Sequence, residues 1–144
     1  MFGSPRRALH LLFLLSFPTV LLAQQGNEHW IEAQVGKLTS SSPNAGALFG
    51  RSIAVDGALA VVGAPLDDNF TGSDSGSAYV YEEIGGRWMP VTEIIGSGGS
   101  ATDLFGESVA ISGTTIVVGA PLDDPASVMN AGSTYLFAIC SGVW

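Results

Sequence analysis

The chain is short, acidic and poor in cysteine. It has 144 residues with 13 acidic and 5 basic side chains, which gives a net charge of −8 at pH 7. This length suits one ordinary domain, and the excess of negative charge repels phosphate backbones, so we expect no nucleic-acid partner. The single cysteine, Cys140, excludes a disulfide within the chain. We expect Cys140 to be a buried free thiol; the alternative is a disulfide to another chain.

The first 23 residues have the composition of a secretory signal peptide. Arg6 and Arg7 precede a nearly unbroken apolar run over residues 9–22, and the small residue Ala23 precedes polar sequence. A basic, an apolar and a small-residue region in this order are typical of a cleaved signal. A membrane anchor is the alternative, but the run is shorter than the ~20 residues that a membrane span needs. We therefore predict a mature chain of residues 24–144 without a membrane span, secreted or displayed at the cell surface.

Residues 48–95 are expected to form four short antiparallel strands. The apolar runs are rich in Val, Ile and Ala, and glycines mark the turns between them. Asp56-Gly57 is the kind of two-residue turn that closes a hairpin, and Gly85-Gly86 is a second. Pro90 favours a strand edge or a bulge, because proline cannot donate a ladder hydrogen bond. The strands are predicted at 52–55, 58–63, 77–82 and 88–95, and no helix is expected after residue 23.

This segment is one copy of an internal repeat. Residues 48–68 read LFGRSIAVDGALAVVGAPLDD and residues 104–124 read LFGESVAISGTTIVVGAPLDD, so 14 of 21 positions are identical at an offset of 56. The same offset relates Tyr79 to Tyr135 and Trp88 to Trp144. Four antiparallel strands that recur at a fixed period are typical of β-propeller blades. The sequence therefore predicts an all-β chain built from two such blades, a partial propeller.

The spacing of two short motifs resembles a known family. Phe49-Gly50 is followed by Gly63-Ala64-Pro65, and the same pattern recurs 56 residues later. These motifs resemble FG-GAP repeats, which form blades of the propeller of integrin α chains. The resemblance covers the mature chain, with a first repeat at about 30–87 and a second at about 88–143. It implies propeller blades of four antiparallel strands that bind ligands or partner subunits. We expect the repeated phenylalanines to pack between neighbouring blades.

The sequence departs from integrin-type repeats in the interval between the two motifs. That interval holds only the short turns Asp56-Gly57 and Ser112-Gly113, whereas the integrin-type repeat carries a loop of calcium ligands. A hard cation needs about six to eight oxygen ligands, which a tight hairpin cannot supply. The chain therefore resembles the calcium-free variant of the repeat, and no cofactor is expected.

Acidic residues gather instead after the second motif of each copy. They are weak candidates for a cation site, because neither copy has a full spacing of ligands. The favoured interpretation is a solvated loop in which Asp and Asn side chains cap their own backbone. The candidates are Asp67, Asp68, Asp74, Asp123 and Asp124.

Two further motifs concern modification and catalysis. Asn69-Phe70-Thr71 is an acceptor sequence for N-glycosylation in a eukaryotic host. His29 is the only histidine after residue 23, and no nucleophile lies in an elbow motif. We therefore expect no catalytic residue and no enzymatic activity.

The function predicted from these features is a secreted or cell-surface propeller module that binds a protein or glycan, for example in adhesion. An accessory propeller of a secreted enzyme and a structural spacer in an extracellular matrix are the alternatives. Propellers close with roughly four to eight blades, so we expect either a fragment of a longer propeller protein or self-association. The exposed blade faces are expected to carry the Val61-Val62 and Val117-Val118 pairs and the repeated phenylalanines.

Overall fold

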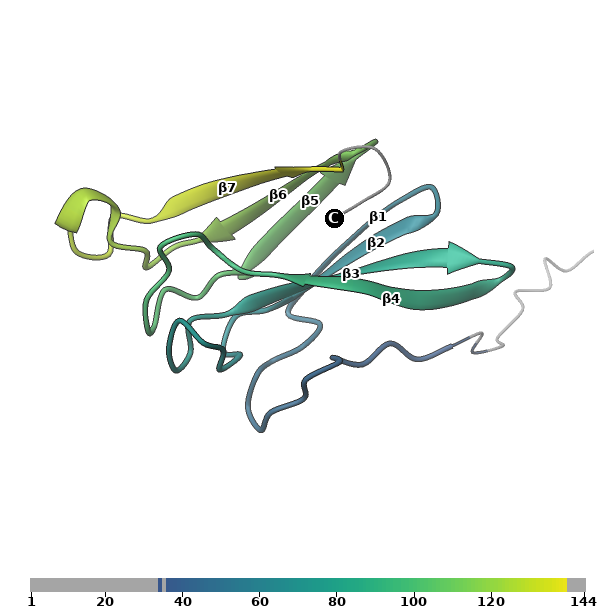
Figure 1. Ribbon diagram of the computed structural model, residues 1–144, viewed down its shortest axis with the longest axis horizontal. Helices are drawn as coiled ribbons and strands as arrows, with labels where there is room; N and C mark the ends of the chain where they lie inside the picture. Colours follow the sequence, from purple (N-terminus) through teal and green to yellow (C-terminus); the bar gives the residue numbers. More distant parts are fainter. Residues whose placement is uncertain (1–33, 35, 140–144) are drawn as a thin grey trace, which may run out of the picture. The chain divides into compact units, whose positions relative to one another are not determined.

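A computed structural model describes residue 34 and residues 36–139, and within them the chain is all-β (Figure 1). The predicted signal peptide and Cys140 lie outside the described residues. Two antiparallel sheets form, with strand orders β1-β2-β3-β4 and β5-β6-β7, which confirms the predicted fold class. The only helical segment in the described part is a 3₁₀ turn, η1 (Pro125–Ser127). The strands are β1 (Ser52–Asp56), β2 (Leu59–Ala64), β3 (Ser77–Ile84), β4 (Arg87–Ile94), β5 (Ser108–Ser112), β6 (Thr115–Ala120) and β7 (Ser133–Ala138).

The hairpins follow from the glycines at their turns. Gly85 and Gly86 both have positive φ, 61° and 80°, which is the backbone of the tight turn that links β3 to β4. The β1–β2 turn lies one residue later than predicted. Asp56 pairs with Leu59, so the two turn residues are Gly57 and Ala58, with Gly57 at a φ of 56°. The reason is that Asp56 can extend the β1 ladder, whereas the left-handed backbone belongs to glycine.

Pro90 lies on β4, the outer strand of the first sheet, opposite Tyr81. The register between β3 and β4 shifts between Val80 and Tyr81, as at a β-bulge. Both features agree with the expected place of a proline in a sheet. In the second sheet β7 (Ser133–Ala138) is the outer strand, and within the described residues no fourth strand pairs with it.

Alternate residues of β2 and β3 enter two different cores. One core lies between the two sheets, where Val61 and Val80 of the first sheet meet Ile116 and Val118 of the second around Phe105. The other core lies on the opposite face of the first sheet, where Phe49 and Leu38 cover Ala60, Val62, Ala64, Tyr79 and Tyr81. Phe105 therefore packs between blades as predicted, whereas Phe49 takes the same place on the outer face of the first blade.

The exposed apolar faces are not lined as the sequence suggested. Val61, Val62 and Val118 are buried, at 0%, 2% and 0% exposure, and only Val117 is half-exposed. Neighbouring residues of a strand point to opposite faces, so one member of each valine pair enters the junction between the blades. The exposed apolar residues on the open faces belong to other strands: Ile53 and Val55 on β1 and Leu136 on β7.

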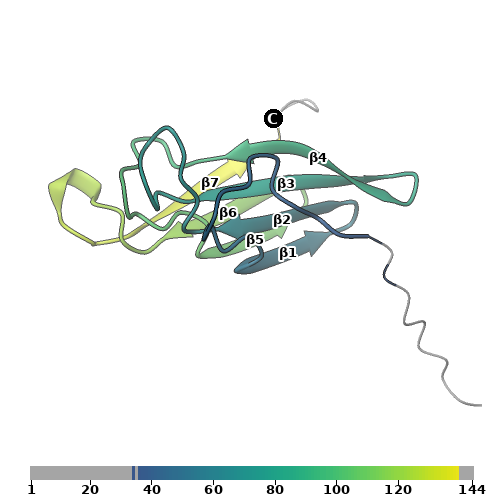
Figure 2. The same ribbon diagram turned by 90° about the horizontal axis from the view of Figure 1, so that it is seen from below.

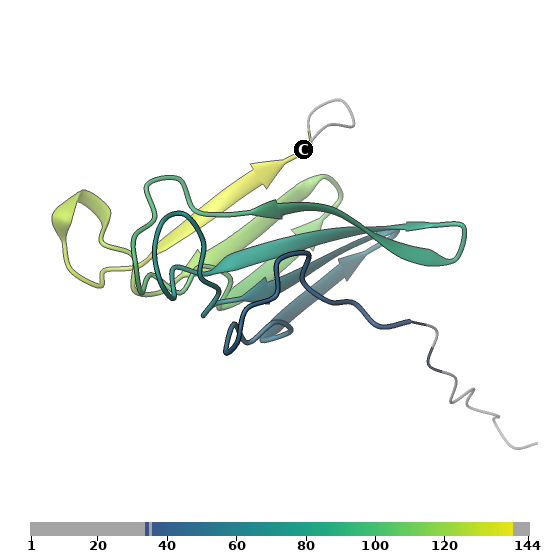
Figure 3. The same cartoon turned by 60° about the horizontal axis from the view of Figure 1, so that its bottom comes forward.

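The connections between strands differ at the two ends of the sheets. The short hairpin turns lie together at one end, and the longer connections after β2, β4 and β6 lie together at the other (Figures 1 and 2). Figure 3 shows the same division from an intermediate angle. We call the second end the loop end.

Candidate functional site

The loop end contains all five acidic residues that the sequence singled out. They lie in two corresponding loops, one over residues 65–76 between β2 and β3 and one over residues 121–132 between β6 and β7. The connection from β4 to β5 passes beside the first of these loops, because Thr102 N donates a hydrogen bond to Ser73 O at 3.0 Å. These three segments together form the candidate binding site.

Asp67 and Asp123 occupy equivalent buried positions and each accepts a hydrogen bond from a tyrosine. The hydroxyl of Tyr79 donates to Asp67 Oδ2, and the hydroxyl of Tyr135 donates to Asp123 Oδ2 at 2.9 Å. The two aspartates are 1% and 8% exposed. Asp67 Oδ1 is also buried and has no hydrogen-bond partner among the described residues. Each carboxylate thus connects its loop to the following strand, β3 or β7, through the tyrosine hydroxyl.

These tyrosine hydroxyls remain protonated at ordinary pH. Burial, together with the hydrogen bond to Asp67, raises the pKa of Tyr79 well above its usual value. Burial and the Asp123 carboxylate raise the pKa of Tyr135 to about 12. Both effects disfavour the phenolate, because a negative oxygen would face a carboxylate in a poorly solvated place.

We predict that the protein loses stability at alkaline pH. A group whose pKa is raised by folding contributes stability below its unfolded pKa, here 10.0, which is lost as the pH rises toward the folded value of about 12 for Tyr135. The midpoint temperature of thermal unfolding should therefore decrease as the pH rises from 10.0 to about 12. The decrease should be smaller in a Tyr135→Phe variant. Circular dichroism melts at stepped pH measure both slopes, and equal slopes would contradict the assignment.

The outer aspartates cap the backbone of the same loops. Asp68 Oδ1 accepts a hydrogen bond from Asp74 N at 2.9 Å, and Asp124 Oδ1 accepts one from Asn130 N at 2.5 Å. Asp74 and Asn130 both have a φ of 52°, a left-handed backbone that Asp and Asn tolerate better than most residues. The two loops thus close in the same way although their sequences differ after Asp124.

The candidate cation ligands do not converge in the described part of the chain. Within it, no group of three or more His, Cys, Asp or Glu side chains is placed to hold a metal ion. The structure divides the five candidates between two loops and directs four carboxylates to tyrosine hydroxyls or backbone amides. For Asp74 the geometry assigns a role only to its backbone N–H.

We predict that folding does not depend on calcium. The ion needs about six to eight oxygen ligands, and four of the five candidate carboxylates already accept hydrogen bonds from tyrosine hydroxyls or backbone amides. Thermal melts with excess calcium and with a chelator should therefore coincide. A midpoint raised by calcium would reveal binding to the native state through mass action, and the Asp68→Asn and Asp124→Asn variants would then identify the loop responsible.

Asn69 organises the tip of the first loop. Its Oδ1 accepts hydrogen bonds from Thr71 N at 2.9 Å and Thr71 Oγ1 at 2.6 Å, and its Nδ2 donates to Gly76 O at 2.8 Å. The nitrogen that a glycan would modify thus has a role inside the loop. Glycosylation at Asn69 stays a prediction, and a modified side chain would keep one N–H for Gly76.

The structure adds residues at the loop end that the sequence did not single out. Phe70 is 90% exposed and Met129 is 80% exposed, and each lies in one of the two corresponding loops. Asp103 is 3% exposed and its Oδ2 accepts a hydrogen bond from Ser100 N at 2.6 Å. Comparison of the repeats could not reveal Asp103, because the first copy has Ala47 at that position. An apolar residue within an acidic loop was the available signal for Phe70.

Comparison with known families agrees with the motif spacing. The model of the FG-GAP repeat family matches twice, over residues 33–81 and 88–137. The chain belongs to the FG-GAP repeat family. No curated protein matches the chain. In the described residues, no helix is long and apolar enough to cross a membrane.

The boundaries of the FG-GAP sequence repeats do not coincide with the boundaries of the sheets. The first match ends at residue 81, within β3, and the second begins at residue 88, within β4. The first sheet nevertheless runs from β1 to β4, so it takes its fourth strand from the start of the second sequence repeat. The first blade of this chain therefore contains residues from two successive FG-GAP repeats.

Proposed function

We propose that this FG-GAP chain is a secreted or cell-surface module that binds an extracellular protein or glycan through the loop end, without catalysis of its own. The observation that carries the proposal is the exposure of Phe70 and Met129 in corresponding loops. Phe and Met are enriched at protein interfaces, where a few buried apolar side chains supply much of the affinity. A large apolar side chain at a loop tip has no role in the core of its own blade.

The surroundings of these residues favour a protein partner with a basic rim over a neutral glycan. Asp68 and Asp124 are exposed near the two apolar tips, and the chain as a whole is strongly acidic. Complementary charge accelerates association and excludes acidic competitors. The basic and apolar layout of residues 1–23 supports secretion, because it is the layout that the export machinery recognises.

We predict that removing the two apolar tips abolishes partner binding without unfolding the protein. Labelled chain is applied to arrays of immobilised extracellular matrix proteins and of glycans, and is compared with a Phe70→Ala, Met129→Ala double variant. Binding should weaken at least about tenfold, which corresponds to ~1.4 kcal/mol. Ile84→Ala is the matched control, since Ile84 is 60% exposed at the opposite end of the sheets. Absence of binding on both arrays, or equal binding by the double variant, would refute the proposal.

A further inference from the structure

The junction between the two blades is built around one dipeptide, Phe105-Gly106. Phe105 N donates a hydrogen bond to Ser75 O at 2.9 Å, and the Ser52 hydroxyl donates to Gly106 O at 2.8 Å. Two glycines of the first blade make room for this backbone. A Cβ on Gly63 would lie 2.0 Å from Gly106 O, and a Cβ on Gly76 would lie 2.1 Å from Phe105 O. The first blade thus holds Phe105-Gly106 at direct backbone contact.

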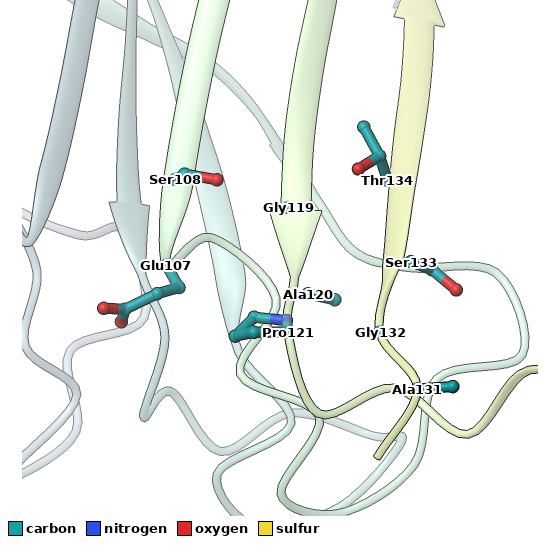
Figure 4. A pocket seen from close by; sticks show the side chains of 9 residues that line it. All are labelled: Glu107, Ser108, Gly119, Ala120, Pro121, Ala131, Gly132, Ser133 and Thr134. Carbon is teal, nitrogen blue, oxygen red and sulfur yellow. The ribbon is translucent and has the colours of Figure 1, made fainter. Parts of the chain in front are cut away.

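The second blade has a hollow at the equivalent place (Figure 4). Its volume is about 500 Å³, and its lining includes Ser108, Gly119, Ala131, Gly132 and Ser133. These residues follow Ser52, Gly63, Ser75, Gly76 and Ser77 by 56 positions. Within the described residues the carbonyl of Ala131 accepts no backbone hydrogen bond, whereas its counterpart Ser75 O accepts the one from Phe105 N. The hollow therefore has the equivalent lining residues and the hydrogen-bond acceptor needed to receive another Phe-Gly dipeptide.

The chain presents a matching dipeptide on its opposite face, Phe49-Gly50. Gly50 and Gly106 share a φ of 92°, and the preceding leucines, Leu48 and Leu104, have φ values of 55° and 59°. Phe49 packs on Tyr79 with ring centroids 5.5 Å apart, as Phe105 packs on Tyr135 at 5.3 Å. Exposure alone differs, because Gly50 is exposed and Phe49 half-buried, whereas Phe105 and Gly106 are buried.

The charges at the junction are arranged so that the contact can be repeated. Arg51 Nη2 lies 2.7 Å from Glu107 Oε1, and the two residues occupy the same position in successive repeats. If the Arg51 face of one chain meets the Glu107 face of another, the pair at this position again has opposite charges. The hydroxyl of Ser108 would then donate to Gly50 O, as Ser52 donates to Gly106 O within the chain.

Exposed apolar side chains surround both halves of this contact. Ile53 and Val55 are 63% and 59% exposed, whereas their counterparts in the second blade, Val109 and Ile111, pack on the core between the blades. Leu136 is 71% exposed, whereas its counterpart Val80 is 1% exposed in that core. A second junction would bury all three residues.

The strand positions that lack a pairing partner also agree with a second junction of this kind. The second sheet has no strand beside β7 in the described residues. The first FG-GAP match begins at residue 33, and described residues 34 and 36–38 belong to no sheet. Leu38 packs on the outer core of the first blade as Ile94, at the end of β4, packs on the core between the blades. Gly36 and Lys37 of another chain would thus approach the edge of β7 that is unpaired in the described residues, where an added strand can pair.

From these observations we propose that the hollow beside β6 and β7 is a socket for Phe49-Gly50 of a second copy, so that chains assemble head to tail. Such a contact joins different surfaces of the two partners, and it closes into a ring only if the rotation allows. With two blades in the described part of each chain, propellers of roughly four to eight blades correspond to rings of about two to four chains. The inference concerns assembly and is independent of the ligand proposed for the loop end.

The test is the mass of the chain in solution, measured by light scattering after size exclusion over a series of concentrations. The wild-type chain should form a discrete species of two to four copies, or longer filaments if the ring stays open. Gly119→Ala places a methyl group where the carbonyl of the incoming Gly50 would lie, and it should give monomers. Leu136→Glu, on the exposed face beside the socket, should also give monomers and needs no change in the core.

Ile84→Glu is the matched control, because it adds the same charge at a 60% exposed residue beside the β3–β4 turn of the first sheet, whereas the socket is lined by the second sheet and its loops. This variant should assemble like the wild type. A wild-type chain that stays monomeric at every concentration would overturn the proposal. Assembly that survives both Gly119→Ala and Leu136→Glu would also overturn it, since the copies would then meet through another surface. If Gly119→Ala fails to fold, Leu136→Glu alone decides.

Discussion

Replacing Phe105 with alanine should lower the free energy of unfolding by ~3–5 kcal/mol, the usual cost of removing a buried phenylalanine. Phe105 is 2% exposed and touches both blades. Its ring packs at 5.3 Å from that of Tyr135 and at 6.0 Å from that of Phe137. The cavity would open at the only junction between blades in the described part of the chain. Urea unfolding of dilute protein, followed by circular dichroism, measures the loss.

Phe49→Ala is the matched comparison, because Phe49 occupies the same position in the first repeat. Phe49 is half-buried and packs on one sheet only, so the expected loss is ~1–2 kcal/mol, in keeping with partial burial. Equal losses for the two variants would mean that the contacts of Phe105 with the first blade contribute little to stability. The comparison is made at dilute concentration, where a second copy would not cover Phe49.

The strands and their hairpins could be predicted from the sequence because local chemistry determines them. Alternation over 77–82, the Gly85-Gly86 turn and the edge position of Pro90 each depend on neighbours along the chain. The 56-residue offset then extended the same register to the second copy, and the observed pairings repeat it: Val61 pairs with Val80, and Val117 with Leu136.

Contacts between blades could not be predicted in the same way. The sequence does not distinguish the two valines of the Val61-Val62 pair. The burial of each depends on what packs against its face of the sheet. One meets Phe105 and the other meets Phe49. Ile53 and Leu136 are left exposed, whereas their counterparts Val109 and Val80 lie at the one junction that the described residues form.

The roles of polar residues at the loop end could not be predicted from the sequence either. The repeated Asp-Asp pairs are identical in sequence, yet the first aspartate of each is buried against a tyrosine and the second caps its loop. The tyrosine partner lies 12 residues later along the chain and on the next strand. Only the pairing of β2 with β3, and of β6 with β7, brings each hydroxyl to its carboxylate.

Replacing Gly63 with alanine should destabilise the chain by about 3 kcal/mol or more, at the upper end of the cost of overpacking a core. Gly63 does not need a left-handed backbone, so the whole effect comes from lack of space. The new methyl carbon would lie 2.0 Å from the carbonyl oxygen of Gly106 and 2.3 Å from Ser52 Oγ. The first of these is a backbone atom that cannot rotate away, so the blades must separate and the hydrogen bond from Ser52 to Gly106 is lost.

Gly119→Ala distinguishes this junction effect from any general cost of alanine in the repeat motif. Gly119 is the counterpart of Gly63, but its nearest neighbour is Ser108 Oγ at 2.4 Å, the end of a side chain that can adopt another rotamer. The stability of dilute Gly119→Ala should therefore stay within about 1 kcal/mol of the wild type, because replacing glycine also reduces the entropy of the unfolded chain. Chemical unfolding of the two variants under identical conditions measures the difference. A Gly63→Ala variant as stable as Gly119→Ala would show that the blades do not meet at Gly106, since no junction of that closeness could accept the methyl group.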